Sequence, residues 1–155
     1  MIAWRIGTDT ADYIAEDLTG AGARITGGRW NRKGMAVLYS AESIALAAIE
    51  TLVHLPSGGL PLNRHLVRIE IPDAAWTARQ DISGSPPVGW DALPAGKVCL
   101  DFGDTWLHKV RSAILVVPSI AVPEERNILV NPLHPDAKGI TATKVRMWTY
   151  VSRLR

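Results

Sequence analysis

The segment 27–50, GGRWNRKGMAVLYSAESIALAAIE, decides how this chain is organised. It contains a glycine-hinged cationic loop, a short β-rich run that ends at Tyr39, and a helical pattern that carries Glu50. Arg29, Tyr39 and Glu50 are separated by 10 and 11 residues, and each lies near the start or end of an expected element. Side chains at such positions face clefts more often than side chains in cores do. We therefore predict that this segment forms the core of an active site.

The loop TGGRWNRKG (26–34) combines glycines with cations. Gly27, Gly28 and Gly34 permit backbone conformations that are closed to other residues, and they let the chain approach a ligand closely. Arg29 offers a planar set of donors that matches phosphate oxygens, and two further basic residues follow it. The loop matches neither the Walker pattern nor GxGxxG. It therefore indicates a phosphate or pyrophosphate site without assigning a known nucleotide-binding fold.

The residues after this loop predict a strand and then a helix. MAVLYS (35–40) has the composition of a buried strand, and Ser40 is expected to cap a helix that continues through 41–55. Glu50 lies at the edge of the apolar face of this helix, where a carboxylate borders either a core or a cleft. On position alone, a partly exposed glutamate without a catalytic task is the more frequent case.

Further elements are expected on both sides of this segment. Strands are predicted at IAWRIG (2–7), RHLVRIEIP (64–72), AILVVPSIAV (113–122) and the terminal VRMWTYVSRLR (145–155). Helices are predicted from Thr8 or Asp9 through Leu18, and from a cap at Asp104, whereas 74–95 is expected to be a long loop. This irregular alternation predicts an α+β fold with a mixed or antiparallel sheet and flanking helices, in one domain that spans 1–155.

The composition argues against several classes of function. A net charge of +2, from 17 Lys+Arg and 15 Asp+Glu, gives too weak a field to indicate nucleic-acid binding. The single cysteine, Cys99, cannot form an intramolecular disulfide, and no stretch approaches the ~18 apolar residues of a membrane span. His54 and His134 lack partners at metal-ligand spacing. We therefore expect a cytoplasmic protein without a metal or a membrane segment.

Several motifs together indicate a dinucleotide cleft. Besides the cationic loop, Tyr39 and Glu50, the chain has Ser119 after a proline that breaks a strand, and Asn127 at the start of the apolar run ILV. In their order along nearly the whole chain, the motifs resemble those of the RES-domain family, named for an Arg, a Glu and a Ser. The segments that carry this resemblance are WR (4–5), GGRWNRKG (27–34), VLYSAES (37–43), ALAAIETLVHL (45–55), GDTWL (103–107) and VPSIAVPEERNILVNPLHPDA (117–137).

This resemblance implies a fold like that of the diphtheria-toxin-like ADP-ribosyltransferases. It also implies the toxin of a bacterial type II toxin–antitoxin pair, which depletes NAD by hydrolysis or phosphorolysis. NAD would be the substrate, with inorganic phosphate as a second reactant in the phosphorolytic case, and no separate cofactor is expected. The implied protein partner is an Xre-like antitoxin with a helix-turn-helix, so the toxin itself would not contact nucleic acid. Self-association as a homodimer is left open.

The resemblance also assigns roles to residues by position. Arg29, assisted by Arg5, would bind the pyrophosphate, and Tyr39 would orient the nicotinamide riboside. Glu50 would stabilise the ribosyl cation or activate its acceptor, and Ser119 would bind the nicotinamide end. Gly28 and Asn127 complete the expected binding residues. Two alternatives remain open. One is a protein ADP-ribosyltransferase, because water, phosphate and protein all attack the same ribosyl carbon. The other is a non-catalytic nucleotide-binding module that uses the same basic loop.

Overall fold

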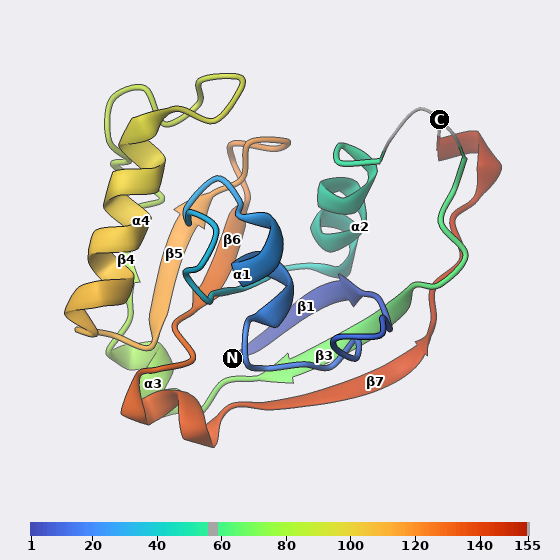
Figure 1. Ribbon diagram of the computed structural model, residues 1–155, viewed down its shortest axis with the longest axis horizontal. Coiled ribbons are helices and arrows are strands. Elements are labelled where there is room, and N and C mark those ends of the chain that lie inside the picture. Colours follow the sequence, from blue (N-terminus) through green and yellow to red (C-terminus); the bar gives the residue numbers. More distant parts are fainter. Residues whose placement is uncertain (56–58, 155) are drawn as a thin grey trace.

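A seven-stranded sheet forms the centre of the computed structural model, which describes residues 1–55 and 59–154 (Figure 1). The strands lie in the order β4-β5-β6-β2-β1-β3-β7. Their bounds are β1 Ile2–Gly7, β2 Leu38–Ala41, β3 His65–Glu70, β4 Gln80–Asp81, β5 Ile114–Pro118, β6 Arg126–Val130 and β7 Thr141–Met147. Strands β4 and β5 are parallel, and all other neighbours are antiparallel. The predicted α+β fold with a mixed sheet is confirmed.

Within the described residues, four helices connect strands along the chain and pack on the sheet. They are α1 Ala21–Thr26, α2 Ile44–Leu52, α3 Asp73–Thr77 and α4 Lys97–Lys109, with 3-10 segments at Pro135–Gly139 and Ser152–Leu154. In Figure 1, α4 stands beside β5, α2 lies on the other side of the molecule, and α1 crosses in front between them. In the described ranges no helix has the length and apolar character that a bilayer span requires.

The sheet bends sharply between β2 and β1. These two strands share one residue pair, Trp4 opposite Ala41, whereas β1 and β3 are paired along their whole length. In Figure 1, β5 and β6 therefore stand upright while β3 and β7 sweep across the lower right. The sheet thus consists of two halves that diverge next to the ends of β1 and β2.

Alternate strand residues form cores on opposite faces of the sheet. One face carries the largest buried cluster, which includes Val67, Ile69, Ile114, Val116 and Ile128. The other face has two clusters, one under α4 with Leu115, Val117 and Leu129, and one under α2 with Ile6, Ala41 and Leu46. Leu129 of the cluster under α4 lies opposite Tyr39, so the two side chains share a face. Ala41 of the cluster under α2 follows Tyr39 by two residues and points the same way, so α2 and α4 cover the same face. Tyr39 and Asn127 lie on this face, whereas Arg5 pairs with Val67 and so belongs to the opposite one.

The predicted helix after Thr8 is wrong. Residues 8–20 form turns and bends, and the first helix begins only at Ala21, after Gly20 with its φ of 73°. The Thr10 hydroxyl accepts the backbone N–H of Tyr13, and the Asp9 carboxylate accepts the N–H of Ala15. Such short polar side chains stabilise turns at the expense of a helix.

Other boundaries also differ from the prediction. Ser40 belongs to β2 and donates to the Ile128 carbonyl at 2.7 Å, so Ser43 caps α2 instead, accepting from the N–H of Leu46 at 3.1 Å. Asp104 lies inside α4, which begins at Lys97 and not at a cap at Asp104. The expected loop 74–95 is interrupted by α3 and β4. The predicted terminal strand shares only residues 145–147 with edge strand β7, which begins at Thr141 and ends at Met147, and 148–154 lie outside any strand.

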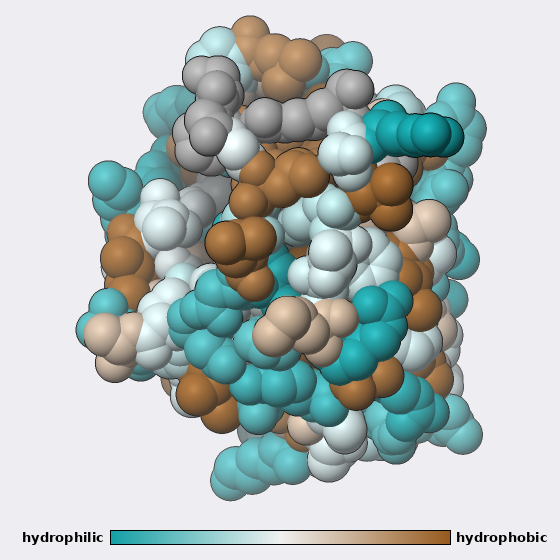
Figure 2. All heavy atoms as spheres, turned by 90° about the vertical axis from the view of Figure 1, so that its right-hand side faces the viewer, coloured by the Kyte–Doolittle hydropathy of each residue, from teal (hydrophilic) through white to brown (hydrophobic). Residues whose placement is uncertain are grey.

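Exposed hydrophobic residues occur on α2 and on β7. Ile49 and Val53 at the end of α2 are 39% and 57% exposed, and Val145 and Met147 on β7 are also exposed. Figure 2 views the molecule from this side and shows hydrophobic groups gathered in its upper centre, among hydrophilic ones. This side of the molecule therefore offers apolar area next to the helix that carries Glu50.

Candidate active site

Two side chains from the sheet hold the Glu50 carboxylate. Its Oε1 atom accepts hydrogen bonds from Ser119 Oγ at 2.6 Å and from Asn127 Nδ2 at 2.7 Å. Glu50 comes from α2, Ser119 follows β5, and Asn127 lies on β6. Within the described ranges, the other carboxylate oxygen, Oε2, has no hydrogen-bond partner. One oxygen is therefore fixed, and the other is left to interact with a ligand.

The turn after β5 explains the position of Ser119. The strand ends at Pro118, and the N–H of Ser119 donates to the Glu125 carbonyl at 2.9 Å, which turns the chain back into β6. The Ser119 hydroxyl also accepts the N–H groups of Ala121 and Val122. It donates its one proton to Glu50, so its hydrogen-bonding capacity is used up, and the residue is fully buried. This geometry favours a role in orienting Glu50 over direct contact with nicotinamide.

Replacing Ser119 with alanine is expected to lower turnover about 10- to 100-fold, because one of the two donors to Glu50 is lost. The rate constant per folded molecule is the quantity to measure. Ser112→Ala is the matched control, since Ser112 is also buried and hydrogen-bonded, to Trp106 and Ile114, but lies outside the site. Equal turnover in both variants would contradict the positioning role.

Tyr39 connects the sheet to the cationic loop. Its hydroxyl accepts the N–H of Trp30 at 3.0 Å and donates to Asn31 Oδ1 at 2.8 Å. Burial raises the pKa of the Tyr39 phenol well above its usual range, which keeps the group protonated. Because the phenol stays protonated, Tyr39 is not suited to act as a general base, and because its only proton is donated to Asn31, it is not a ready general acid either. What the residue offers to the site is its ring and the position of the loop that it holds.

Asn31 is a residue of the site that the sequence argument missed. It is fully buried, and its Nδ2 donates to the carbonyls of Ala23, Met35 and Arg32. Its Oδ1 accepts from Tyr39, so one side chain joins α1, the loop and β2. The available indication was its type, because asparagine inside a glycine-rich loop commonly hydrogen-bonds nearby backbone groups.

Gly28 and Arg29 lie on the same loop but serve different contacts. A Cβ atom on Gly28 would lie 2.7 Å from the Tyr39 hydroxyl oxygen, so only glycine fits between the loop and that phenol. Arg29 Nη1 donates to the carbonyls of Trp90 and Ala92, both at 2.9 Å. It forms no ion pair with any described residue, so its charge is not neutralised by a carboxylate.

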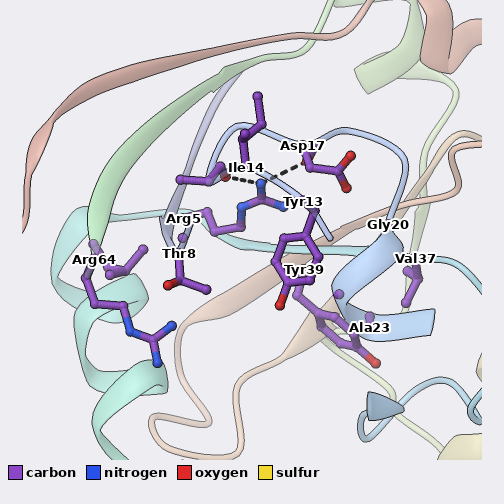
Figure 3. Close-up of a pocket in the computed structure, with 14 residues that line it drawn as sticks. Arg5, Thr8, Tyr13, Ile14, Asp17, Gly20, Ala23, Val37, Tyr39 and Arg64 are labelled. Carbon is purple, nitrogen blue, oxygen red and sulfur yellow. Dashed lines mark hydrogen bonds between the residues drawn. The ribbon is translucent and has the colours of Figure 1, made fainter. Parts of the chain in front are cut away.

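A cavity of about 180 Å³ lies beside Tyr39 and contains Arg5 (Figure 3). Arg5 Nη2 donates to the carbonyl of Ala15 and, at 2.8 Å, to that of Asp17. Burial lowers the pKa of Arg5 to about 10, against the opposing effect of Asp17, so the guanidinium stays charged at neutral pH. The cavity-lining residues include Arg5 and Tyr39, but not Glu50 or Arg29.

Strand register connects this cavity to the Glu50 cluster. In the antiparallel pair β2–β6, Tyr39 lies opposite Leu129 and Ala41 lies opposite Asn127. Side chains of opposed residues share a face, so Tyr39 and Asn127 are diagonal neighbours on the face under α2 and α4. The structure thus brings together Glu50, Ser119 and Asn127, sets Tyr39 beside them, and leaves the Arg29 guanidinium directed at the loop 82–96.

Within the described ranges, no three His, Cys, Asp or Glu side chains are grouped to hold a metal ion.

Comparison with known proteins identifies the family. The model of the RES domain matches residues 2–152. The chain belongs to the RES-domain family. This confirms the resemblance inferred from the sequence motifs.

Curated relatives of this RES-domain protein are named as toxins. It is 59% identical over 152 residues to the "Prs ADP-ribosylating toxin" of Sphingobium sp., an alignment that covers 97% of this chain and 94% of the relative. It is 42% identical to "Toxin Res" of Yersinia enterocolitica, over 79% of each chain. The corresponding "Toxin Res" of Pseudomonas putida is 36% identical over 99% of each chain. The RES-domain protein is therefore a homologue of toxins over nearly its full length.

A solved structure with a similar fold is the crystal structure of the M. tuberculosis MbcT–MbcA toxin–antitoxin complex. The TM-score is 0.58 at 16% sequence identity, and the match covers 94% of this chain and 84% of that chain. At this identity the likeness concerns the fold.

Proposed function

We propose that this RES-domain protein is a toxin that cleaves the nicotinamide–ribose bond of NAD and transfers the ADP-ribose to a protein. The observation that carries the proposal is the Glu50 carboxylate, with Oε1 fixed by Ser119 and Asn127 and Oε2 without a partner among the described residues. A fixed negative charge beside a sugar ring stabilises the cation that develops when the leaving group departs. The printed name of the 59% identical relative supports a protein as acceptor.

The proposed reaction needs little from the protein beyond orientation and charge. The C–N bond between ribose and nicotinamide breaks, and its electron pair leaves with nicotinamide, which becomes neutral. Glu50 stabilises the resulting ribosyl cation. An acceptor nucleophile then bonds to the same carbon, and its proton passes to Glu50 Oε2 or to solvent. Cations on the cationic loop and in the cavity, Arg29 and Arg5, would offset the charge of the diphosphate.

Hydrolysis or phosphorolysis of NAD, the activity that the family resemblance implies, shares the first step of this reaction. Glu50 Oε2 favours it equally, because that oxygen can receive a proton from water or phosphate as well as from a protein side chain. In that case the toxin would act by depleting NAD. The two proposals differ only in where the ADP-ribose is found after the reaction.

Product analysis tests both proposals. The purified protein, freed of any antitoxin, is incubated with NAD labelled in its adenylate half and with Prs, the protein that the name of the 59% identical relative gives as the target, with or without inorganic phosphate. We expect free nicotinamide and a label on Prs. A label found only in ADP-ribose or its phosphorylated form would replace transfer by depletion. Bound NAD without release of nicotinamide under every condition would leave the non-catalytic nucleotide-binding module as the function.

An antitoxin is the proposed protein partner. Two observations support it: the fold neighbour was solved as a toxin–antitoxin complex, and α2 exposes Ile49 and Val53 next to Glu50. A protein that covered the end of α2 would bury this apolar area and restrict access to the carboxylate. The helix-turn-helix character of that partner stays a prediction from the family resemblance, as do a cytoplasmic location and a homodimer.

A further inference from the structure

A second arginine, Arg64, lines the cavity that contains Arg5 (Figure 3). It lies directly before β3, and neither the cationic loop nor the family motifs pointed to it. Figure 3 shows Arg5 in the centre, Arg64 on one side of it and Tyr39 on the other. Arg64 forms no ion pair with the residues that the structure describes. The cavity therefore contains two guanidinium groups from different parts of the chain.

Both guanidinium groups have an unused donor. The Nε atoms of Arg5 and Arg64 are buried and have no hydrogen-bond partner within the described ranges. Buried donors are rarely left unpaired, and an arginine donor is a costly group to leave so. Arg5 already uses Nη2 for the carbonyls of Ala15 and Asp17, which fixes its orientation without neutralising it. The two unpaired N–H groups are therefore free to donate to an acceptor that enters this cavity.

The charges around the cavity favour an anion. Arg5, Arg64 and Asp17 are the charged residues among those that line it, which gives two cations against one carboxylate. The Asp17 oxygens accept from the Thr19 hydroxyl at 2.8 Å and from the Ala21 N–H at 3.3 Å. The nearby carboxylates of Asp9 and Glu16 form ion pairs with Lys144 at 2.8 Å and 3.4 Å. Asp9 and Glu16 share this one lysine, so an excess of one positive charge is found only among the residues that line the cavity, where it lies on the arginine pair.

We propose that Arg5 and Arg64 together bind one phosphate group in this cavity. Guanidinium groups present planar pairs of donors that match phosphate oxygens, and two of them on one cavity select a phosphate over a monovalent carboxylate. The identity of the ligand rests on the proposed function. The group is either a phosphate of the NAD diphosphate or the inorganic phosphate that accepts ADP-ribose.

The test compares Arg64→Gln and Arg64→Lys with wild type and with the control Arg24→Gln. Arg24 is an exposed arginine on α1 next to the cavity-lining Ala23, and its side chain does not line the cavity. Nicotinamide release is measured against NAD concentration, with and without inorganic phosphate. For a diphosphate subsite, Arg64→Gln raises KM for NAD about tenfold with little change in kcat, and Arg64→Lys restores part of the loss. For a free-phosphate subsite, KM for NAD is unchanged and the phosphate dependence of the rate disappears.

A binding measurement separates this proposal from the catalytic one. The thermal midpoint of wild-type protein is recorded with and without inorganic pyrophosphate, and then with inorganic phosphate. We expect stabilisation by at least one of these anions in wild type and in Arg24→Gln, and much less in Arg64→Gln. If wild type releases no nicotinamide but shows this difference, the proposed function fails and the subsite stands. Equal kinetics and equal stabilisation in Arg64→Gln and Arg24→Gln would overturn the subsite.

Discussion

Replacement of Glu50 by glutamine is expected to reduce nicotinamide release from NAD by about 10³-fold or more. The glutamine carbonyl oxygen can still accept hydrogen bonds from Ser119 and Asn127, so the side chain keeps its position. What is lost is the negative charge that faces the developing ribosyl cation, and with it the proton acceptor for the incoming nucleophile. The expected loss therefore appears in kcat, while affinity for NAD changes little.

Glu124→Gln is the matched control for this variant. Glu124 is an exposed glutamate on the 119–125 turn that also carries Ser119. Its replacement by glutamine removes the same negative charge, but outside the site. Steady-state release of nicotinamide and the thermal midpoint are measured for both variants. Turnover of Glu50→Gln within tenfold of the control, at an equal thermal midpoint, would remove Glu50 from the mechanism.

Replacement of Gly103 by alanine is expected to destabilise the fold by about 3 kcal/mol or more. Gly103 is buried on the face of α4 that packs against the cationic loop. A Cβ atom there would overlap the carbonyl oxygen of Trp30 and lie 2.6 Å from its carbonyl carbon. Because the obstacle is backbone, no side-chain rotation relieves the overlap, and α4 has to separate from the loop.

Urea denaturation provides the measurement for Gly103→Ala. Gly84→Ala serves as the control, since a Cβ atom at Gly84 meets nothing within 4 Å, and its effect is expected to stay within about 0.5 kcal/mol. Folded molecules of Gly103→Ala should also turn over more slowly, because the Trp30 N–H donates to the Tyr39 hydroxyl. Equal denaturation midpoints for the two variants would show that α4 and the loop do not pack as described.

Strongly patterned segments were predictable from sequence because their pattern is local. The alternating residues of β3 gave a strand with nearly correct bounds, and the helical spacing around Glu50 gave α2. The apolar run of β5 gave a strand that starts at the right place but was predicted four residues too long. The types of the site residues were also predictable, since the family motifs supplied positions for Glu50 and Ser119. The contact between Glu50 and Ser119 was not predictable, because these residues are 69 positions apart and meet only through the pairing of β2, β6 and β5.

The errors share a physical cause, which is competition between local and distant partners for the same side chain. Asp9 could have capped a helix, but it binds the Ala15 N–H and forms an ion pair with Lys144, 135 residues away. Asp104 could have started α4, but its carboxylate pairs with Arg32 at 2.8 Å, and the helix begins about two turns before it, at Lys97. Neither partner can be identified from neighbouring residues.

The positions of the two donors to Glu50 along the chain have a consequence for protein synthesis. Glu50 is made early, whereas Ser119 and Asn127 follow 69 and 77 residues later. A nascent chain that ends before residue 119 therefore contains the glutamate but neither donor, and it lacks the β5–β6 hairpin beside β2. Under the proposed mechanism such a chain is inactive on the ribosome. The time needed to complete the toxin chain is then available for a partner made at the same time to accumulate, before the first active toxin molecule is released.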